Sequence, residues 1–387
     1  MMNKEAQVLN KVGRGYTPKP RSSNLELFRI ISMLLIVAHH YVVNSGLTAV
    51  DGPIYADPMS YRSMFLLIFG AFGKTGINCF VLISGYFMCK SEITARKFCK
   101  LLFEIEFYKI AIWLVFLLTG YEIFSLMGLV KVLLPVKTIS TGFTSCYLVF
   151  FLFIPFLNIL IWNISEKQHI KLLLLCSFMY IIIGTIPGFG VTMNYVSWFI
   201  VLYFIGSYIR LYDKKIFSNT QFWSCCTLTT LLVSVSSVIG MTWIGSLIGK
   251  SGIGFWLLSD SNKFLAVALA LSSFMFFKNV KMKNSKFINT VAASSFGVLM
   301  IHANSDTMRR WLWKDVLDNV GMYDSTWLVI HAIGSVLAIY IICTAIDYLR
   351  IRFIEKSFFK FWDKHWDKIK ERYFKMENRV CKKLKIR

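Results

Sequence analysis

The stretch NLELFRIISMLLIVAHH, residues 24–40, decides the fold class, because it places ionisable side chains inside an apolar run. Crossing the roughly 30 Å hydrocarbon layer of a membrane takes about 20 apolar residues in a helix. Similar runs recur as far as Asp347, and the 387-residue chain is 56% hydrophobic and only 17% charged. A water-soluble domain has a far more polar composition. The sequence therefore predicts an all-α fold, a polytopic integral membrane bundle of about ten transmembrane helices.

Ten apolar segments define the predicted crossings. They cover residues 26–44, 64–88, 98–119, 144–164, 170–186, 195–212, 221–244, 261–277, 288–303 and 326–347. The loop 120–143 contains a shorter apolar run from Ile123 to Val136. This run is too short to cross and is predicted to lie at the membrane interface. A crossing there would reverse the side of every later loop.

The distribution of Lys and Arg predicts the orientation, since basic loops stay in the cytoplasm. The N-terminal segment and alternate loops are basic, with Lys4, Lys11, Arg14, Lys19 and Arg21, then Lys90, Arg96, Lys97 and Lys100, then Lys167 and Lys171, then Arg210, Lys214 and Lys215, then Lys278, Lys281, Lys283 and Lys286. Both termini are thus predicted to be cytoplasmic. The domain organisation expected is a basic segment 1–23, a membrane domain 24–348 and a basic tail 349–387.

The tail from Arg350 to Arg387 has fourteen basic and five acidic residues. Its apolar residues recur at helical spacing, at Trp362, Trp366, Ile369 and Tyr373. This pattern predicts an amphipathic helix on the anionic inner leaflet. No nucleic-acid-binding motif accompanies the charge, so nucleic acid is not an expected partner.

The nine cysteines lack the spacing of metal ligands, and no metal site is expected. The polar, basic start of the chain has no signal-peptide cleavage pattern, so the first helix is predicted to remain as an anchor.

The first predicted helix holds the main site candidates, because ionisable groups inside a membrane are costly and mark functional sites. Arg29 and His40 are eleven residues apart, which places them about 20° apart on one helix face and about 16 Å apart along it. Glu26 falls near the same face, whereas His39 points about 80° away. The alternative for Arg29 is an interfacial anchor, and for His40 a neutral histidine bonded between helices.

The second predicted helix contains GKTGINCFVLISGY, residues 73–86, in which Lys74, Asn78 and Ser84 are candidates. The small residues favour close helix packing, which is the structural alternative for the whole motif. A nucleophilic Ser84 needs a base, and His40 can supply one only if the two helices are neighbours.

Later helices add weaker candidates: Trp198, Tyr203, His302 and Arg309. A lone histidine such as His302 is more often structural, and Trp198 has the alternative of a membrane-interface residue. Glu104 is a further candidate for a polar cavity, while Glu106 and Lys109 are predicted to pair.

Taken in order, these residues resemble the membrane-bound acyltransferases of family 3, which acylate extracellular sugars. The resemblance rests on Glu26-x-x-Arg29 followed by His40, on Phe80-x-x-x-Ser84-Gly85-Tyr86, on Pro155-Phe-Leu-Asn158, on Trp198-Phe-x-x-x-Tyr203-x-x-Gly206 and on Ser295-Phe-Gly-x-x-x-x-His302. It implies a ten-helix membrane domain, here without the extracytoplasmic domain that some members add. It also implies an acyl-coenzyme A donor and a glycan or lipid-linked sugar acceptor, in a bacterial cell membrane and with no permanently bound cofactor.

The resemblance gives the candidates their expected roles. Arg29 would hold the phosphates of the donor, and His40 would act as general base or acyl carrier, with Ser84 as a second possible nucleophile. The expected substrate-binding residues are Glu26, Lys74, Asn78, Trp198, Tyr203, His302 and Arg309. Direct transfer and a covalent intermediate both remain open.

Two other functions fit the same sequence. A transporter or flippase for a lipid-linked sugar or small solute would use Arg29, His40 and Glu104 as a proton relay. A membrane scaffold would have no need of these side chains.

Overall fold

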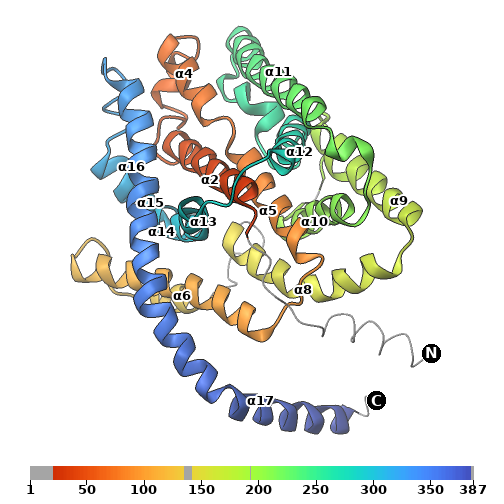
Figure 1. The fold of residues 1–387 in the computed structure, drawn as a ribbon. Helices are drawn as coiled ribbons and strands as arrows, with labels where there is room; N and C mark the ends of the chain where they lie inside the picture. Colours follow the sequence, from red (N-terminus) through yellow and green to blue (C-terminus); the bar gives the residue numbers. More distant parts are fainter. Residues whose placement is uncertain (1–20, 135–141, 192, 385–387) are drawn as a thin grey trace.

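The computed structural model describes residues 21–134, 142–191 and 193–384, and these ranges form helices and connecting turns without any strand (Figure 1). The first half contains α2 (Ser23–Val43), α3 (Pro53–Ala56), α4 (Tyr61–Gly70), α5 (Gly73–Met88), α6 (Ala95–Leu118), α7 (Leu126–Leu133), α8 (Phe143–Asn163), α9 (Glu166–Cys176), η1 (Ser177–Ile183) and α10 (Tyr195–Leu211). The second half contains η2 (Lys215–Ser218), α11 (Thr220–Leu247), η3 (Ser251–Leu258), α12 (Phe264–Asn279), α13 (Lys286–Ala293), α14 (Ser295–His302), α15 (Asp306–Arg310), η4 (Trp311–Val316), α16 (Leu328–Leu349), η5 (Arg350–Glu355) and α17 (Lys356–Leu384).

The prediction of an all-α membrane bundle is confirmed, and each of the ten predicted crossings coincides with a helix or a pair of consecutive helices. Six helical stretches are long and apolar enough to cross a membrane. The other four predicted crossings fall on α6, which carries more charge, on the shorter α10 and α12, and on the pair α13 and α14. The count of ten remains a prediction.

Helix α2 occupies the centre of the bundle and packs against α5, α4, α12, α13, α14 and α16 (Figure 1). Its start is fixed by Asn24, whose side-chain nitrogen donates to the carbonyls of Phe277 at 2.9 Å and Lys278 at 3.1 Å. Both carbonyls lie at the end of α12, where that of Phe277 also accepts from the amide of Val280 at 3.2 Å. The helix that carries Arg29 and His40 is therefore held on all sides.

Glycines bring α5 into close contact with α2. A Cβ atom on Gly76 would lie 2.6 Å from the carbonyl oxygen of Ser32, and one on Gly73 would lie 2.3 Å from Cβ of His39. Both distances are shorter than real contacts allow, so only glycine fits at these positions. The small residues of the 73–86 motif therefore pack helices together, as the structural alternative for that motif predicted.

Two of the predicted crossings are interrupted, although the sequence predicted continuous helices over 64–88 and 288–303. The first breaks between α4 and α5, where Gly70 and Gly73 flank the two residues outside the helices. Glycine costs about 1 kcal/mol relative to alanine inside a helix, which favours a break at this position. The carbonyl of Gly70 lies 2.6 Å from Nδ1 of His39. The second interruption lies at Ser294, between α13 and α14.

The short helix α7 lies within the loop for which the sequence predicted an interfacial helix. It has only eight residues, and all its side chains are exposed or half-buried, including Leu126 and Leu133. The predicted apolar run continues to Val136, and residues 135–141 lie outside the described ranges.

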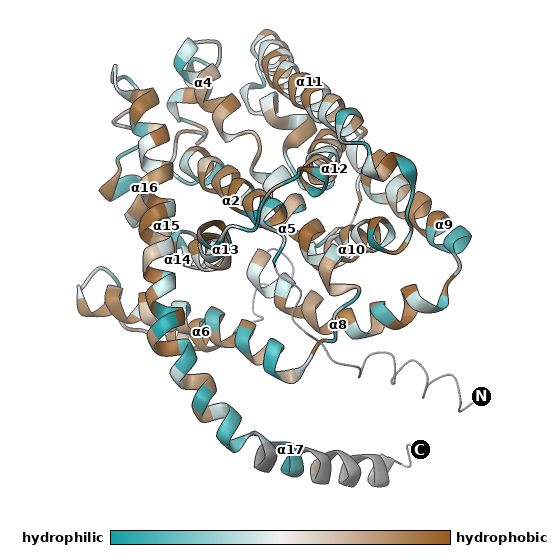
Figure 2. Cartoon of the chain, in the orientation of Figure 1, coloured by the Kyte–Doolittle hydropathy of each residue, from teal (hydrophilic) through white to brown (hydrophobic). Residues whose placement is uncertain are grey.

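The tail forms α17, which bends away from α16 and is far more hydrophilic than the bundle helices (Figures 1 and 2). Its first turns are attached to the start of α6, because Arg96 donates to both carboxylate oxygens of Asp363, at 2.9 and 3.0 Å. These bonds hold the pKa of the Asp363 carboxyl below its usual range. Trp362 and Trp366 stack at 5.4 Å, as the helical spacing predicted, whereas the side chains of Ile369 and Tyr373 lie outside the described part.

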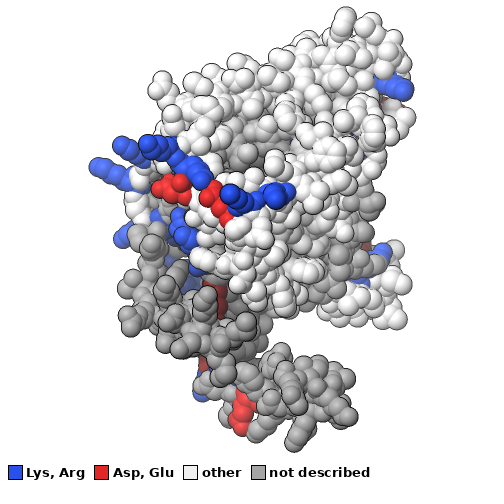
Figure 3. Space-filling view, turned by 90° about the vertical axis from the view of Figure 1, so that its right-hand side faces the viewer, with Lys and Arg blue, Asp and Glu red and all other residues white. Residues whose placement is uncertain are grey.

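Much of the remaining surface is apolar. Large side chains such as Leu118, Phe156 and Ile341 are exposed, which is expected of helices that face lipid. Figure 3 shows one face on which charged residues gather in one area beside a broad surface without charge.

A buried ion cluster joins α6, α16 and η5. Arg350 is 3% exposed, and its guanidinium contacts Asp347 at 2.8 Å, Glu355 at 2.8 Å and Glu104 at 3.2 Å. The hydroxyl of Tyr108 also donates to Asp347, at 2.8 Å. Glu104, a candidate for a polar cavity in the sequence, is therefore one member of a structural ion cluster.

Candidate active site

Two histidines from distant parts of the chain meet near the C-terminal end of α2. Nδ1 of His40 lies 3.0 Å from Nε2 of His302, which is the last residue of α14. His302 is 0% exposed, and its Nδ1 lies 2.6 Å from the carbonyl oxygen of Val298 on its own helix. Three of the four ring nitrogens thus have a partner, and Nε2 of His40 has none among the residues that the structure describes.

The contacts determine which nitrogens carry hydrogen when both rings are neutral. A carbonyl oxygen only accepts, so Nδ1 of His302 donates to Val298. A neutral imidazole has a single N–H, so Nε2 of His302 accepts and Nδ1 of His40 donates to it. Nε2 of His40 then carries a lone pair. This is the form a general base requires, and His302 fixes it as the orienting group of a catalytic triad does.

An aromatic cluster packs against one side of this histidine pair. Trp313 of η4 packs edge-on against His302 at 6.3 Å and against Tyr41 at 6.0 Å. The hydroxyl of Tyr41 in turn lies 2.8 Å from Nδ1 of His331 on α16. His39 differs from His40 in its partner, because its Nδ1 lies against the Gly70 carbonyl and not against a second histidine.

Arg29 lies nearer the N-terminal end of α2, over the ring of Phe80 at 5.6 Å. Its closest carboxylate oxygen, on Glu26, is 3.6 Å away, which is too long for a hydrogen bond. Its side chain is 24% exposed, and its Nε has no hydrogen-bond partner among the residues the structure describes. Arg29 therefore has donors free for an anionic ligand, with Glu26 beside it.

The face of α2 between Arg29 and His40 is apolar. Met33 and Ile36 occupy it and are almost fully buried, at 0% and 2% exposure. The two polar positions share one helix face, and packed side chains separate them in this structure.

Ser84 does not meet a histidine. Its hydroxyl donates to the carbonyl of Phe80 at 3.0 Å and lies 3.0 Å from the hydroxyl of Tyr147 on α8, and within the described ranges no histidine bonds to it. Helices α2 and α5 are neighbours, but Gly73 is the residue of α5 beside His39, and Phe80 is the one beside Arg29. Ser84 lies a further turn along α5, away from His40. The pairing of Ser84 with a His40 base, which the sequence left conditional, is therefore not formed in this structure.

Asn78, Trp198 and Tyr203 are buried and fully engaged in helix packing. Nε1 of Trp198 donates to Oδ1 of Asn78 at 2.9 Å, and Nδ2 of Asn78 donates to the carbonyl of Ser261 at 2.7 Å. The hydroxyl of Tyr203 donates to Asn158 on α8. This placement ties α5, α8 and α10 together and does not support the predicted contacts of these residues with substrate.

Lys74 and Arg309 lie towards the same end of the bundle as His40. Nζ of Lys74 donates to the hydroxyl of Tyr195 at 2.8 Å and lies 3.7 Å from Asp260. Arg309, in α15 just after His302, contacts Asp306 at 2.9 Å. Both remain partly exposed, so both stay candidates for substrate contact.

The pairing of His40 with His302 was missed by sequence reasoning, which assigned His302 to substrate binding. The two residues are 262 positions apart, and a single sequence carries no signal for such a contact. Trp313 and Tyr147 were also missed, since an aromatic residue in a membrane helix has no feature that separates a site wall from ordinary packing.

Comparison with known proteins assigns the class. The family model of the acyltransferase domain, acyltransferase family 3, matches residues 22–347, and the chain belongs to this family. It is a multi-pass membrane O-acyltransferase. No curated protein and no solved structure matches the chain.

Proposed function

We propose that the protein transfers an acyl group, most simply acetyl, from cytoplasmic acyl-coenzyme A across the membrane to a hydroxyl of an extracytoplasmic or lipid-linked glycan. The main support for this proposal is a series of two hydrogen bonds. Nδ1 of His302 donates to the Val298 carbonyl, and Nε2 of His302 accepts from Nδ1 of His40, which leaves Nε2 of His40 free to act as a base. The basic loops support an orientation with both termini in the cytoplasm of a bacterial cell, which places Arg29 on the inner side and His40 farther out.

In the proposed reaction, Nε2 of His40 takes the proton of the acceptor hydroxyl while its oxygen attacks the thioester carbonyl. The carbon–sulfur bond breaks, an ester forms, and the proton passes from His40 to the departing thiolate. Direct transfer fits better than an acyl-enzyme on Ser84, because no histidine or carboxylate in the described ranges bonds to Ser84.

Arg29 would hold a phosphate of the donor at the inner side through charge-assisted bonds. The pantetheine arm would follow the face of α2 from Arg29 to His40. These residues are eleven positions apart, which is about 16 Å along a helix. The arm would displace Met33, whose flexible side chain is suited to such movement.

Comparing cells with and without the protein tests the proposed function. Base-labile acetate on cell-surface glycans is expected to depend on the wild-type protein and to be lost with His40→Ala. Equal ester content in the two strains would contradict the proposal.

Replacing Arg29 with alanine is expected to raise KM for acetyl-coenzyme A by about 10–100-fold, because a hydrogen bond to a charged group contributes about 1.5–3 kcal/mol. S-acetylpantetheine, which lacks the nucleotide phosphates, serves as the control donor, and its kinetics are expected to be the same in both proteins. An equal loss with both donors would show that Arg29 does not bind the phosphates.

Replacing His302 with alanine is expected to lower kcat roughly 100-fold with little change in KM, because it removes the acceptor that fixes the His40 ring. His302→Gln should restore much of the rate, since the amide oxygen can accept from Nδ1 of His40. A purely structural role predicts no such rescue and no change in the pH profile of kcat. His331→Ala, at a histidine outside this pair, is the matched control.

A further inference from the structure

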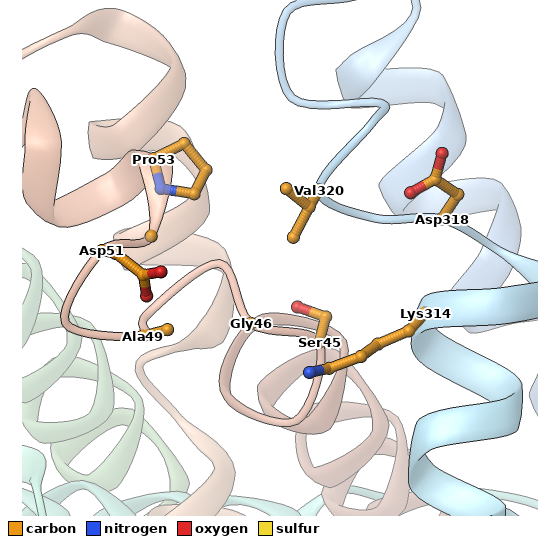
Figure 4. A pocket seen from close by; sticks show the side chains of 9 residues that line it. Ser45, Gly46, Ala49, Asp51, Pro53, Lys314, Asp318 and Val320 are labelled. Carbon is orange, nitrogen blue, oxygen red and sulfur yellow. The ribbon is translucent and has the colours of Figure 1, made fainter.

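We propose that a pocket beyond the C-terminal end of α2 binds the acceptor, and that this acceptor is a neutral, hydroxyl-rich sugar unit; the inference rests on the proposed function. The pocket has a volume of about 290 Å³ and is lined by Ser45, Gly46, Asp51, Lys314, Asp318 and Val320, among others (Figure 4). This volume is close to the lower end of small-ligand pockets, which begin at about 300 Å³ and so suit one sugar unit.

The lining offers both acceptors and donors for hydroxyl groups. The carboxylate of Asp51 points into the pocket, and Lys314 extends across it towards Ser45 (Figure 4). Lys314 forms no salt bridge with any residue that the structure describes, so its ammonium is free to donate. Two carboxylates against one ammonium disfavour an anionic ligand, which is why the proposal specifies a neutral acceptor.

The shape of the pocket depends on two positions with positive φ. Gly46 has a φ of +97°, and a Cβ there would lie 3.7 Å from Cε of Lys314, so the loop passes directly beneath the lysine side chain. Asp318 has a φ of +43°, a conformation that is uncommon outside glycine but that aspartate adopts more readily than most residues. The amide of Gly321 donates to Oδ1 of Asp318 at 3.1 Å and holds this carboxylate in place.

Neither histidine of the pair lines the pocket, but residues adjacent in the chain connect the two. Trp313 packs on His302, and the next residue in η4, Lys314, lines the pocket. On the opposite wall Ser45 follows His40 by five residues, about 7.5 Å if measured along a helix. Asn319 is 0% exposed and donates to the carbonyl of Tyr41 at 2.9 Å. A sugar held here would therefore have a fixed position relative to His40.

Filling the pocket tests the proposal. Val320→Trp places a large side chain at the lining, whereas Val316→Trp is a matched control, since both valines are exposed, at 42% and 52%, and Val316 does not line the pocket. The readouts are base-labile acetate on cell-surface glycans and binding of radiolabelled acetyl-coenzyme A to the purified protein. Val320→Trp is expected to weaken binding of the acceptor sugar and so to lower glycan acetate by at least about tenfold. Donor binding is expected to be unchanged.

Lys314→Ala is the second variant, and a roughly tenfold loss of glycan acetate is expected from the lost charged hydrogen bond. If Val320→Trp also loses donor binding, Lys314→Ala decides the outcome. Wild-type glycan acetate in Lys314→Ala, or in a Val320→Trp protein that binds donor, would overturn the proposal. His40→Ala distinguishes failure of the proposed function from failure of the pocket proposal. Glycan acetate that survives in His40→Ala would contradict the proposed function itself.

Discussion

Replacing His40 with alanine is expected to lower kcat for acyl transfer by about 10²–10⁴-fold, the usual contribution of a general base. The reason is the arrangement of the pair, in which Nε2 of His40 is the ring nitrogen with a free lone pair. Binding of acetyl-coenzyme A should persist, since Arg29 lies about 16 Å away along the helix. Radiolabelled acetyl transfer to glycan and equilibrium binding of the donor measure the two quantities separately.

Two further variants control this result. His40→Gln can still donate to Nε2 of His302 but cannot accept a proton as a base, so it is expected to be as inactive as His40→Ala. His39→Ala removes an adjacent histidine whose Nδ1 contacts the Gly70 carbonyl, and most activity should remain. Near-wild-type turnover in His40→Gln would show that the residue acts only through packing.

Replacing Arg350 with alanine is expected to lower the free energy of unfolding by about 3–5 kcal/mol, the typical cost of removing one partner from a buried ion pair. Asp347, Glu355 and Glu104 would remain buried without the cation that all three contact. Thermal unfolding of the purified protein in detergent gives the measurement.

Arg352→Ala is the matched control for Arg350, because Arg352 is exposed and donates to the hydroxyl of Tyr348 at 3.1 Å. Its loss should change stability by less than about 0.5 kcal/mol, as is usual for surface substitutions. Equal stability of the two variants would mean that the ion cluster does not stabilise the junction between α16 and α17.

The positions of the helices could be predicted from the sequence because a membrane crossing requires only a long apolar run. The run at 26–44 became α2, and the one at 195–212 became α10, each with small shifts in the bounds. The breaks at Gly70–Gly73 and at Ser294 could not be predicted in this way. They depend on contacts that form between α2 and its neighbours only in the folded protein, such as that of His39 with the Gly70 carbonyl.

Only part of the site could be predicted from the sequence. Periodicity alone placed Arg29 and His40 on one helix face, since both belong to the same helix. The partner of His40 could not be found, because His302 comes from α14 and only folding brings the two together. Asn78 and Trp198 are residue types that are common in binding sites, but here they bond to each other. A sequence does not show whether a polar side chain is bonded within the protein or is free to bind a ligand.

The most direct test of the central claim is the sidedness of the reaction in sealed membrane vesicles given radiolabelled acetyl-coenzyme A. Inside-out vesicles with the wild-type protein should place label on glycan within the lumen, and His40→Ala vesicles should not. Right-side-out vesicles should place none, because the donor then meets the outer face. Equal labelling in both orientations, or labelling that persists in His40→Ala, would contradict transfer through the bundle by His40.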